Sequence, residues 1–199
     1  MNPASHFLIS WLTANTIQLD RRERFLITFS GLAPDADGLG IIGDLLTRNS
    51  DKPLQWWGEY HHLLGHNIAF GCCLAAGTFF LAKQRKAAAA LLALISFHLH
   101  LFCDLIGSRG PDGYQWPLPY LWPFSDAWQW AWQGQWALDA WPNLLITVAV
   151  LAATFLMAWQ SGRSPLEFIS SRANAAFVAS LRSRFGEPRM EERKEPACS

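Results

Sequence analysis

Histidine and aspartate residues recur along the first half of the chain at spacings that suit a metal site. His100 and Asp104 are four residues apart, so on a helix they share a face. An imidazole and a carboxylate one turn apart can bind one metal ion, or the carboxylate can bridge two. The alternative is a hydrogen bond between them that holds helices together. Because ionisable groups inside apolar helices are costly and tend to be functional, we favour the metal site.

Further candidate ligands lie before the first apolar stretch or at its start. His62 and His66 have the helical spacing of four, whereas His61 and His66 are five apart, and spacing alone does not choose between His61 and His62. Asp35 and Asp37 are two close carboxylates whose mutual repulsion a cation would relieve. A solvated turn is the simpler interpretation of that motif alone.

The segments that position these residues are apolar enough to lie in a membrane. The chain is 51% hydrophobic and 16% charged, which fits a polytopic membrane protein. Each of three stretches has close to the roughly 20 residues that cross about 30 Å of hydrocarbon. The three predicted membrane helices are Leu63–Ala82, Ala87–Gly107 and Asn143–Gln160.

Basic residues predict how these helices are oriented. Thirteen of the 16 lysines and arginines lie in segments 21–24 and 83–86 and after residue 160. The positive-inside rule makes these segments cytoplasmic, and with them the C-terminus, and it places segments 34–62 and 108–142 in the periplasm. The candidate ligands then gather at the outer face of the membrane. The formal net charge of zero argues against a nucleic-acid partner.

Shorter segments complete a predicted all-α, polytopic membrane helix bundle. Residues 5–19, which include His6, and residues 25–33 are too short to span and predict an N-terminal helical hairpin. Residues 38–47 are either a short helix or a loop. Seven of the 11 tryptophans lie between residues 116 and 141, as expected for a loop at the headgroup layer, and residues 125–139 could form a helix in the membrane plane.

The C-terminal part changes in character. Ser164-Pro165-Leu166-Glu167 has the pattern of a capping box, and an apolar stripe with arginines beside it predicts an amphipathic cytoplasmic helix over residues 163–186. The charged tail, 187–199, is predicted to be disordered. We therefore expect a membrane-embedded domain over residues 1–162, followed by this helix and tail. The four cysteines suggest no disulfide framework.

A family resemblance rests on the order of these motifs over roughly residues 5–125. His6, Pro34-Asp35-Ala36-Asp37, His61 to Asn67, and His100 to Asp104 occur in that order. The chain thereby resembles bacterial inner-membrane metal-dependent hydrolases, also called LexA-binding, inner-membrane-associated hydrolases. That family shows Pro-Asp-x-Asp, His-Arg-Gly-x-Thr-His-Ser and His-x-x-x-Asp. Here His62-Leu63-Leu64-Gly65 replaces Arg-Gly-x-Thr, and Asn67 replaces Ser.

The resemblance implies a set of metal ligands, with His61 favoured over His62. The implied ligands are His6, Asp35, Asp37, His61, His66, His100 and Asp104. The mixture also resembles that of zinc-dependent phospholipases C, which implies hydrolysis of a phosphoester with Asp104 as a bridging ligand.

We therefore expect a membrane-bound hydrolase with two or three divalent ions, Zn²⁺ or Mn²⁺, since His and Asp ligands suit both. Its substrate would be a phosphoester of a lipid or lipid-linked molecule at the outer face of the inner membrane. Asp104 and Arg109 would act in catalysis, since Arg109 is the one cation in segment 108–142 and can neutralise developing charge. The alternatives are the site where a metal transporter admits its ion, or a non-catalytic scaffold with a structural metal.

Overall fold

The computed structural model describes residues 1–110 and 113–188 of the 199-residue chain. Among these residues every regular element is a helix and no strand occurs, so the predicted all-α fold is confirmed. Most of the tail that we expected to be disordered, residues 189–199, lies outside the described residues. The helices are α1 (Pro3–Ala14), α2 (Arg21–Ser30), η1 (Ala33–Leu39), α3 (Gly40–Thr47), α4 (Trp56–Tyr60), α5 (Ile68–Leu81), α6 (Lys86–Gly107), α7 (Trp141–Ser161), η2 (Pro165–Phe168) and α8 (Ser171–Phe185), of which η1 and η2 are 3₁₀ helices.

Contacts divide the chain into two compact units, Met1–Leu151 and Ala152–Ser199, which are described separately. The division falls inside α7, and the predicted domain boundary after residue 162 stays a prediction.

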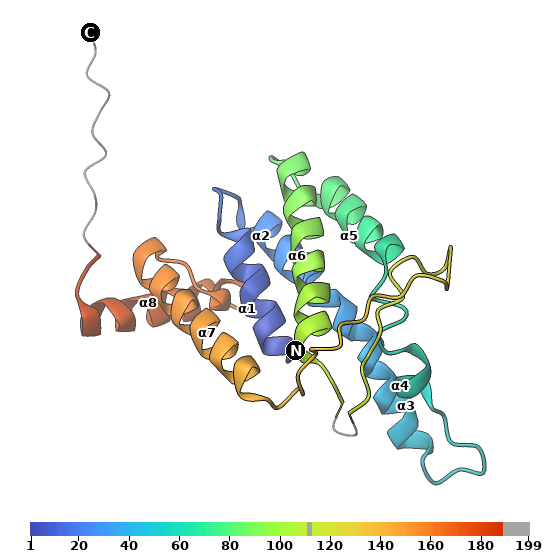
Figure 1. Cartoon of the computed structure of the whole chain (residues 1–199). Helices are drawn as coiled ribbons and strands as arrows, with labels where there is room; N and C mark the ends of the chain where they lie inside the picture. The colour runs from blue at the N-terminus through green and yellow to red at the C-terminus, as the bar shows by residue number, and fades with distance from the viewer. Residues whose placement is uncertain (111–112, 189–199) are drawn as a thin grey trace. The chain divides into compact units, whose positions relative to one another are not determined.

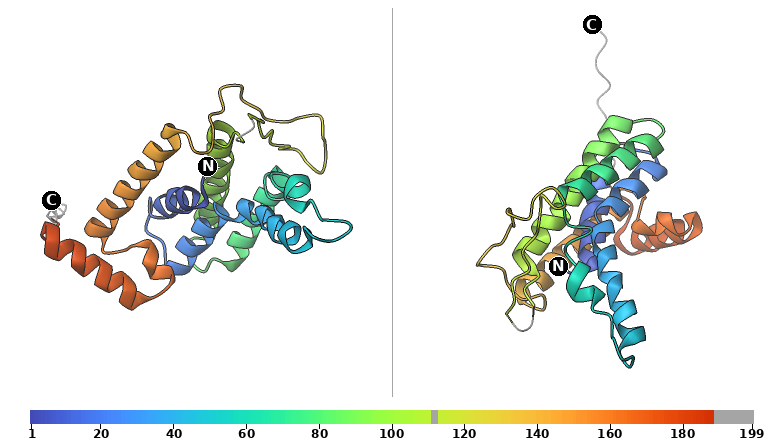
Figure 2. Two further views of the ribbon diagram at one scale, coloured as in Figure 1. Left: turned by 90° about the horizontal axis from the view of Figure 1, so that it is seen from below. Right: turned by 90° about the vertical axis from the view of Figure 1, so that its right-hand side faces the viewer.

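Helix α6 is central to the first unit. Helices α1, α2 and α5 each pack against it, as Figure 1 and the two views of Figure 2 show. Ala89 and Ala93 of α6 form a buried cluster with Ala14 of α1 and Ile27 of α2. Because alanine side chains are small, they let helix backbones approach closely. The packing brings the N-terminal helices against α6, which carries His100 and Asp104.

Two helices are long and apolar enough to cross a membrane, namely α6 with 22 residues and α7 with 21. They confirm the predicted stretches Ala87–Gly107 and Asn143–Gln160. A third candidate is formed by α2 and the following helical segment Ala33–Thr47, which contains η1 and α3. The two are bent by 51° relative to each other and would count as one broken span. The described part of the chain therefore offers two or three candidate spans.

The predicted helix Leu63–Ala82 is wrong at its start. Helix α5 begins at Ile68 and has 14 residues, or roughly 21 Å at 1.5 Å per residue. Asn67 is its N-cap, and the Oδ1 atom of Asn67 accepts the backbone N–H of Phe70 at 2.9 Å. The residues before Asn67 form a turn, because the Asp37 carboxylate accepts the backbone N–H of Gly65 at 3.1 Å. Hydropathy could not show this, since Leu63 and Leu64 continue the apolar run.

Helices α1 and α2 pack against each other, where a short N-terminal hairpin was predicted. A capping box formed by Asp20 and Glu23 begins α2. The Glu23 carboxylate also accepts the backbone N–H groups of Gln84 at 2.9 Å and Arg85 at 2.8 Å. This carboxylate therefore ties the start of α2 to the link between α5 and α6. The ambiguous segment 38–47 is largely helical, as α3.

The predicted Trp-rich helix over residues 125–139 is wrong, since this segment has turns and no helix. Its backbone groups pair across the loop instead of along a helix. The N–H of Trp130 donates to the carbonyl of Leu118 at 2.8 Å, and the N–H of Trp136 donates to the carbonyl of Ile106 at 3.0 Å. The first bond closes the loop on itself, and the second ties the loop to the C-terminal end of α6.

In the second unit, the predicted capping box at Ser164 is wrong. The Ser164 side chain makes no cap hydrogen bond to the 3₁₀ helix η2. Its hydroxyl instead donates to Asn174 Oδ1 at 2.9 Å. Helix α8 begins seven residues later, at Ser171, with Ser170 as its N-cap, and it ends before Gly186, whose φ is 79°. The single amphipathic helix that we expected is therefore broken into η2 and α8.

Candidate metal centre

Helix α6 places His100 and Asp104 on one buried face. His100 Nε2 is 3.0 Å from Asp104 Oδ2, and each residue is 2% exposed. His100 Nδ1 lies 2.8 Å from the carbonyl oxygen of Gly31 at the end of α2. Because a carbonyl only accepts, Nδ1 carries the proton, and in the neutral ring the lone pair of Nε2 is available to a cation beside the Asp104 carboxylate. Holding one ring nitrogen this way is how proteins orient metal-binding histidines.

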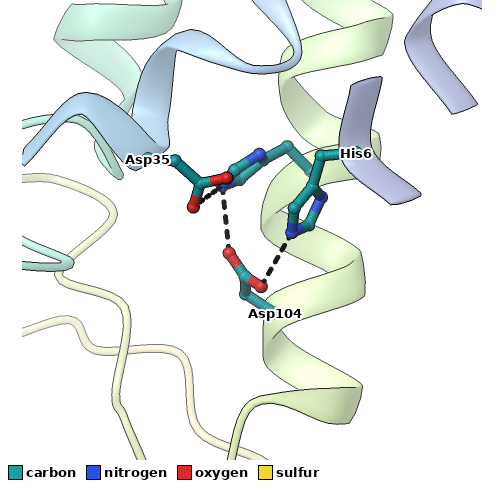
Figure 3. Close-up of side chains that lie close together, drawn as sticks. His6, Asp35 and Asp104 are labelled. Atoms are coloured by element: carbon teal, nitrogen blue, oxygen red, sulfur yellow. Dashed lines mark hydrogen bonds and ion pairs between the residues drawn. The ribbon is translucent and has the colours of Figure 1, made fainter. Parts of the chain in front are cut away.

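His6 and Asp35 reach the same point from α1 and η1. His6 Nε2 is 3.2 Å from Asp104 Oδ1, and its ring stacks on that of His100 with centroids 3.8 Å apart. Asp35 Oδ1 is 3.7 Å from His100 Nε2. Figure 3 shows His6, Asp35 and Asp104 pointing toward one another. The four residues each offer one ligand atom, and these atoms lie within 4.8 Å of one another, so the group could hold a metal ion. The Met1 amino group also contacts Asp104 Oδ1.

His66 joins from the turn before α5. Its Nε2 is 3.2 Å from His100 Nε2 and 3.4 Å from Asp104 Oδ2. Ligands bonded at about 2.0–2.1 Å to one tetrahedral ion lie roughly 3.3 Å apart. The distances among His66, His100 and Asp104 are therefore of the size found between metal ligands, although His66 and His100 fall in different groups of candidate ligands.

Asp37 and His61 lie beside this centre rather than within it. Asp37 Oδ2 lies 3.0 Å from His66 Nδ1, and Asp37 Oδ1 lies 2.9 Å from His61 Nδ1. The His61 ring also stacks on Trp57, with centroids 4.0 Å apart. Asp37 thus holds His66 so that Nε2 of that ring faces His100. Their predicted role as ligands stays a prediction.

His62, which the family resemblance disfavoured, belongs to a second group of candidate ligands, His62, His66 and Asp104. Burial and the neighbouring His66 lower the pKa of His62 well below its usual value. Burial also acts to lower the pKa of His66, but its hydrogen bonds to Asp104 and Asp37 outweigh burial and raise that pKa to about 9. The raised pKa favours the protonated form of His66 near neutral pH in the ion-free protein.

A pocket of about 660 Å³ leads to the centre. Asp35, His62, Asp104 and Arg109 line it together with apolar and aromatic side chains, among them Leu39, Trp57, Tyr114, Trp116 and Leu138. Arg109 is held at the pocket by its backbone, since its N–H donates to the carbonyl of Trp136 at 3.1 Å.

Sequence reasoning missed Gln135 and Gly31. The Gln135 side chain is buried and donates to the backbone carbonyl of Asp104 at 2.9 Å. It lies in the Trp-rich loop, where no spacing signal marks it. The Gly31 carbonyl orients His100 through the backbone, which no residue type reveals. His98, two residues before His100, lies outside the centre, and its Nε2 is 2.9 Å from the Tyr120 hydroxyl.

Comparison with known proteins places this chain in a family. The family model described as YdjM inner membrane protein matches residues 1–184. The chain belongs to the YdjM inner membrane protein family. This membership agrees with the inner-membrane family that the motifs resemble, and with the apolar helices α6 and α7. No curated protein and no solved structure matches, so the likeness to zinc-dependent phospholipases C has no support.

Proposed function

We propose that this member of the YdjM family is a membrane-bound, metal-dependent hydrolase that acts on a phosphoester of a lipid or lipid-linked molecule. The observation that carries the proposal is the convergence of His6, Asp35, His100 and Asp104 from three helices on a buried point beside a pocket.

The residues present fit a divalent cation. Asp35 Oδ2 is buried and has no hydrogen-bond partner among the described residues, and Asp35 offers a ligand atom beside that of the buried Asp104 carboxylate. Two carboxylates so placed are stabilised by a cation between them. Imidazole and carboxylate ligands suit Zn²⁺ and also Mn²⁺, and we propose zinc as the ion.

The ion, Arg109 and the apolar side chains of the pocket would each have a different role at this centre. A divalent ion held there by His6, Asp35, His100 and Asp104 would supply Lewis-acid chemistry, activating water and polarising a phosphoryl oxygen. Arg109 lines the same pocket and would neutralise charge that develops on the phosphoryl group. Trp57, Trp116 and Leu138 line it too and would hold an apolar part of the substrate. A pocket lined by both a cationic side chain and apolar side chains suits an amphiphilic substrate.

The test is to replace His100 and Asp104 separately by alanine. We expect each variant to lose bound metal and phosphodiesterase activity while still inserting into the membrane. Cys103→Ala is the matched control, because Cys103 is buried on α6 between them and belongs to neither ligand group. The measurements are elemental analysis of detergent-purified protein and hydrolysis of phosphodiester and lipid-phosphate substrates. Full activity in either variant would refute the hydrolase.

The same preparation distinguishes the alternatives. Metal flux into liposomes without hydrolysis would identify a transporter. Bound metal with neither flux nor hydrolysis would identify a scaffold whose metal is structural.

We also propose that the centre opens toward the periplasm and that the C-terminus is cytoplasmic. The positions of the basic links support this orientation. Reporter fusions after residues 84 and 190 should report cytoplasm, and one after residue 120 should report periplasm. The opposite pattern would invert the topology.

A further inference from the structure

His62 adopts a backbone conformation that its residue type disfavours. Its φ is 66°, in the left-handed region where glycine is the usual residue. Side chains held in such strained conformations concentrate at functional sites, where the surrounding structure enforces them. Here the conformation directs the His62 ring inward, and the residue is only 6% exposed.

The ring lies among groups that bind metals. Its centroid is 4.5 Å from that of His66, and one of its nitrogens lies within 4.8 Å of ligand atoms of both His66 and Asp104. The Nδ1 atom of His62 is buried and has no hydrogen-bond partner within the described segments. A buried imidazole nitrogen without a partner is an unfavourable arrangement that a metal ion would relieve.

We propose that His62, His66 and Asp104 bind a second divalent transition-metal ion, with Asp104 bridging the two ions. The inference rests on the proposed metal centre and adds to it a position that uses His62. The first position has four candidate ligands without His62 or His66. Asp104 can serve both, because Oδ1 is 3.2 Å from His6 Nε2 while Oδ2 is 3.4 Å from His66 Nε2.

The ligand set defines the chemistry of this second position. Two imidazoles and one carboxylate favour Zn²⁺ or Co²⁺ over Mg²⁺ or Ca²⁺, which prefer oxygen ligands. Three protein ligands leave a coordination position open for water or for a phosphoryl oxygen. His62 and Asp104 both line the pocket, so a ligand in the pocket could reach that position. Two ions sharing a carboxylate can clamp the attacking and leaving oxygens of a phosphoester.

His61 does not take this role, although the family resemblance favours it. Its Nδ1 is 2.9 Å from Asp37 Oδ1, and it belongs to neither ligand group. It lies next to His62 in the chain, and their ring centroids are 4.3 Å apart, so His61 serves as a matched control.

The experiment measures Zn²⁺ bound at saturation to the full chain in detergent, after removal of metals with a chelator. We expect two equivalents for the wild type, one for His62→Asn and two for His61→Asn. Asparagine tolerates positive φ, so His62→Asn should keep the turn, and His62→Gly removes the ring with even less strain. Circular dichroism and the melting temperature verify folding of each variant.

The outcomes separate this inference from the proposed function. Two equivalents retained in both His62 variants, or one lost in His61→Asn, would overturn the second position. If the wild type binds one equivalent, and His100→Ala loses it while His62→Asn keeps it, the second position is overturned and the first position stands. A wild type that binds no Zn²⁺ would overturn both.

Discussion

Asp37→Asn tests whether Asp37 is a metal ligand or a residue that positions one. The Asp37 carboxylate lies near three nitrogens, His61 Nδ1 at 2.9 Å, His66 Nδ1 at 3.0 Å and Gly65 N at 3.1 Å. Asparagine has one acceptor oxygen and an NH₂ group, so it can satisfy at most part of this set. His66 would then lose the bond that directs its Nε2 toward His100 and Asp104.

Loss of a partner that orients a metal-binding histidine weakens metal affinity by about 10–100-fold, or roughly 1.4–2.7 kcal/mol. We expect the Kd for Zn²⁺ to rise by that factor in Asp37→Asn, while the number of ions bound at saturation stays that of the wild type. Competition against a chromogenic chelator measures the Kd, and elemental analysis measures the number.

Asp44→Asn is the matched control. The Asp44 carboxylate also accepts backbone N–H groups, those of Trp56 at 2.6 Å and Trp57 at 3.0 Å, but it belongs to neither ligand group. Its replacement should leave the Kd for Zn²⁺ unchanged. If Asp37→Asn removed an ion at saturation, Asp37 would be a ligand, as the sequence and the resemblance predicted. An unaltered Kd would show that the hydrogen bond to His66 has no role in metal binding.

Three further perturbations follow from the geometry. Gly65→Ala would place a Cβ 2.4 Å from the Pro34 carbonyl oxygen, so we expect it to destabilise the protein by about 1–3 kcal/mol and lower its melting temperature. The control is Gly77→Ala, whose Cβ would meet nothing within 4 Å and which should leave the melting temperature unchanged. Equal melting temperatures for the two variants would contradict the reasoning. Glu23→Ala removes the acceptor for the N–H groups of Gln84 and Arg85, so trypsin should cleave the link 83–86 faster than in the wild type. An unchanged rate of cleavage would show that the Glu23 carboxylate does not hold this link. Because the ion must displace a proton from His66, whose pKa is about 9, Zn²⁺ affinity should rise about tenfold per pH unit between about pH 6 and pH 8, and a flat profile would refute the displacement.

The sequence predicted what depends on composition and local spacing. Helix α6 was located within one residue of its start, because a long apolar run in a membrane protein admits few other structures. The pairing of His100 with Asp104 followed from helical spacing alone. The link between His6 and Asp104 rested on the order of motifs, since those residues are 98 positions apart.

What the sequence could not predict depends on contacts between distant segments. Asp37 shapes the turn that delays the start of α5, and only the fold shows that its carboxylate meets Gly65 and His66. The positive φ of His62 is likewise not readable from the sequence, and spacing left both His61 and His62 open as candidate ligands. The loop after α6 has the aromatic composition of an interfacial helix, but its backbone bonds to Leu118 and Ile106 prevent one.

The candidate ligands come from four separate stretches of chain, namely α1, η1, the turn before α5, and α6. An ion held by all of them would act as a cross-link between these stretches. This cross-link could form only after α1 had docked against α6. A ligand that binds the folded state alone raises the free energy of unfolding by about 2.7 kcal/mol at a concentration 100 times its Kd. Cells starved of the metal would then carry a less firmly assembled protein that membrane proteases degrade sooner. Metal supply would then set the lifetime of the protein.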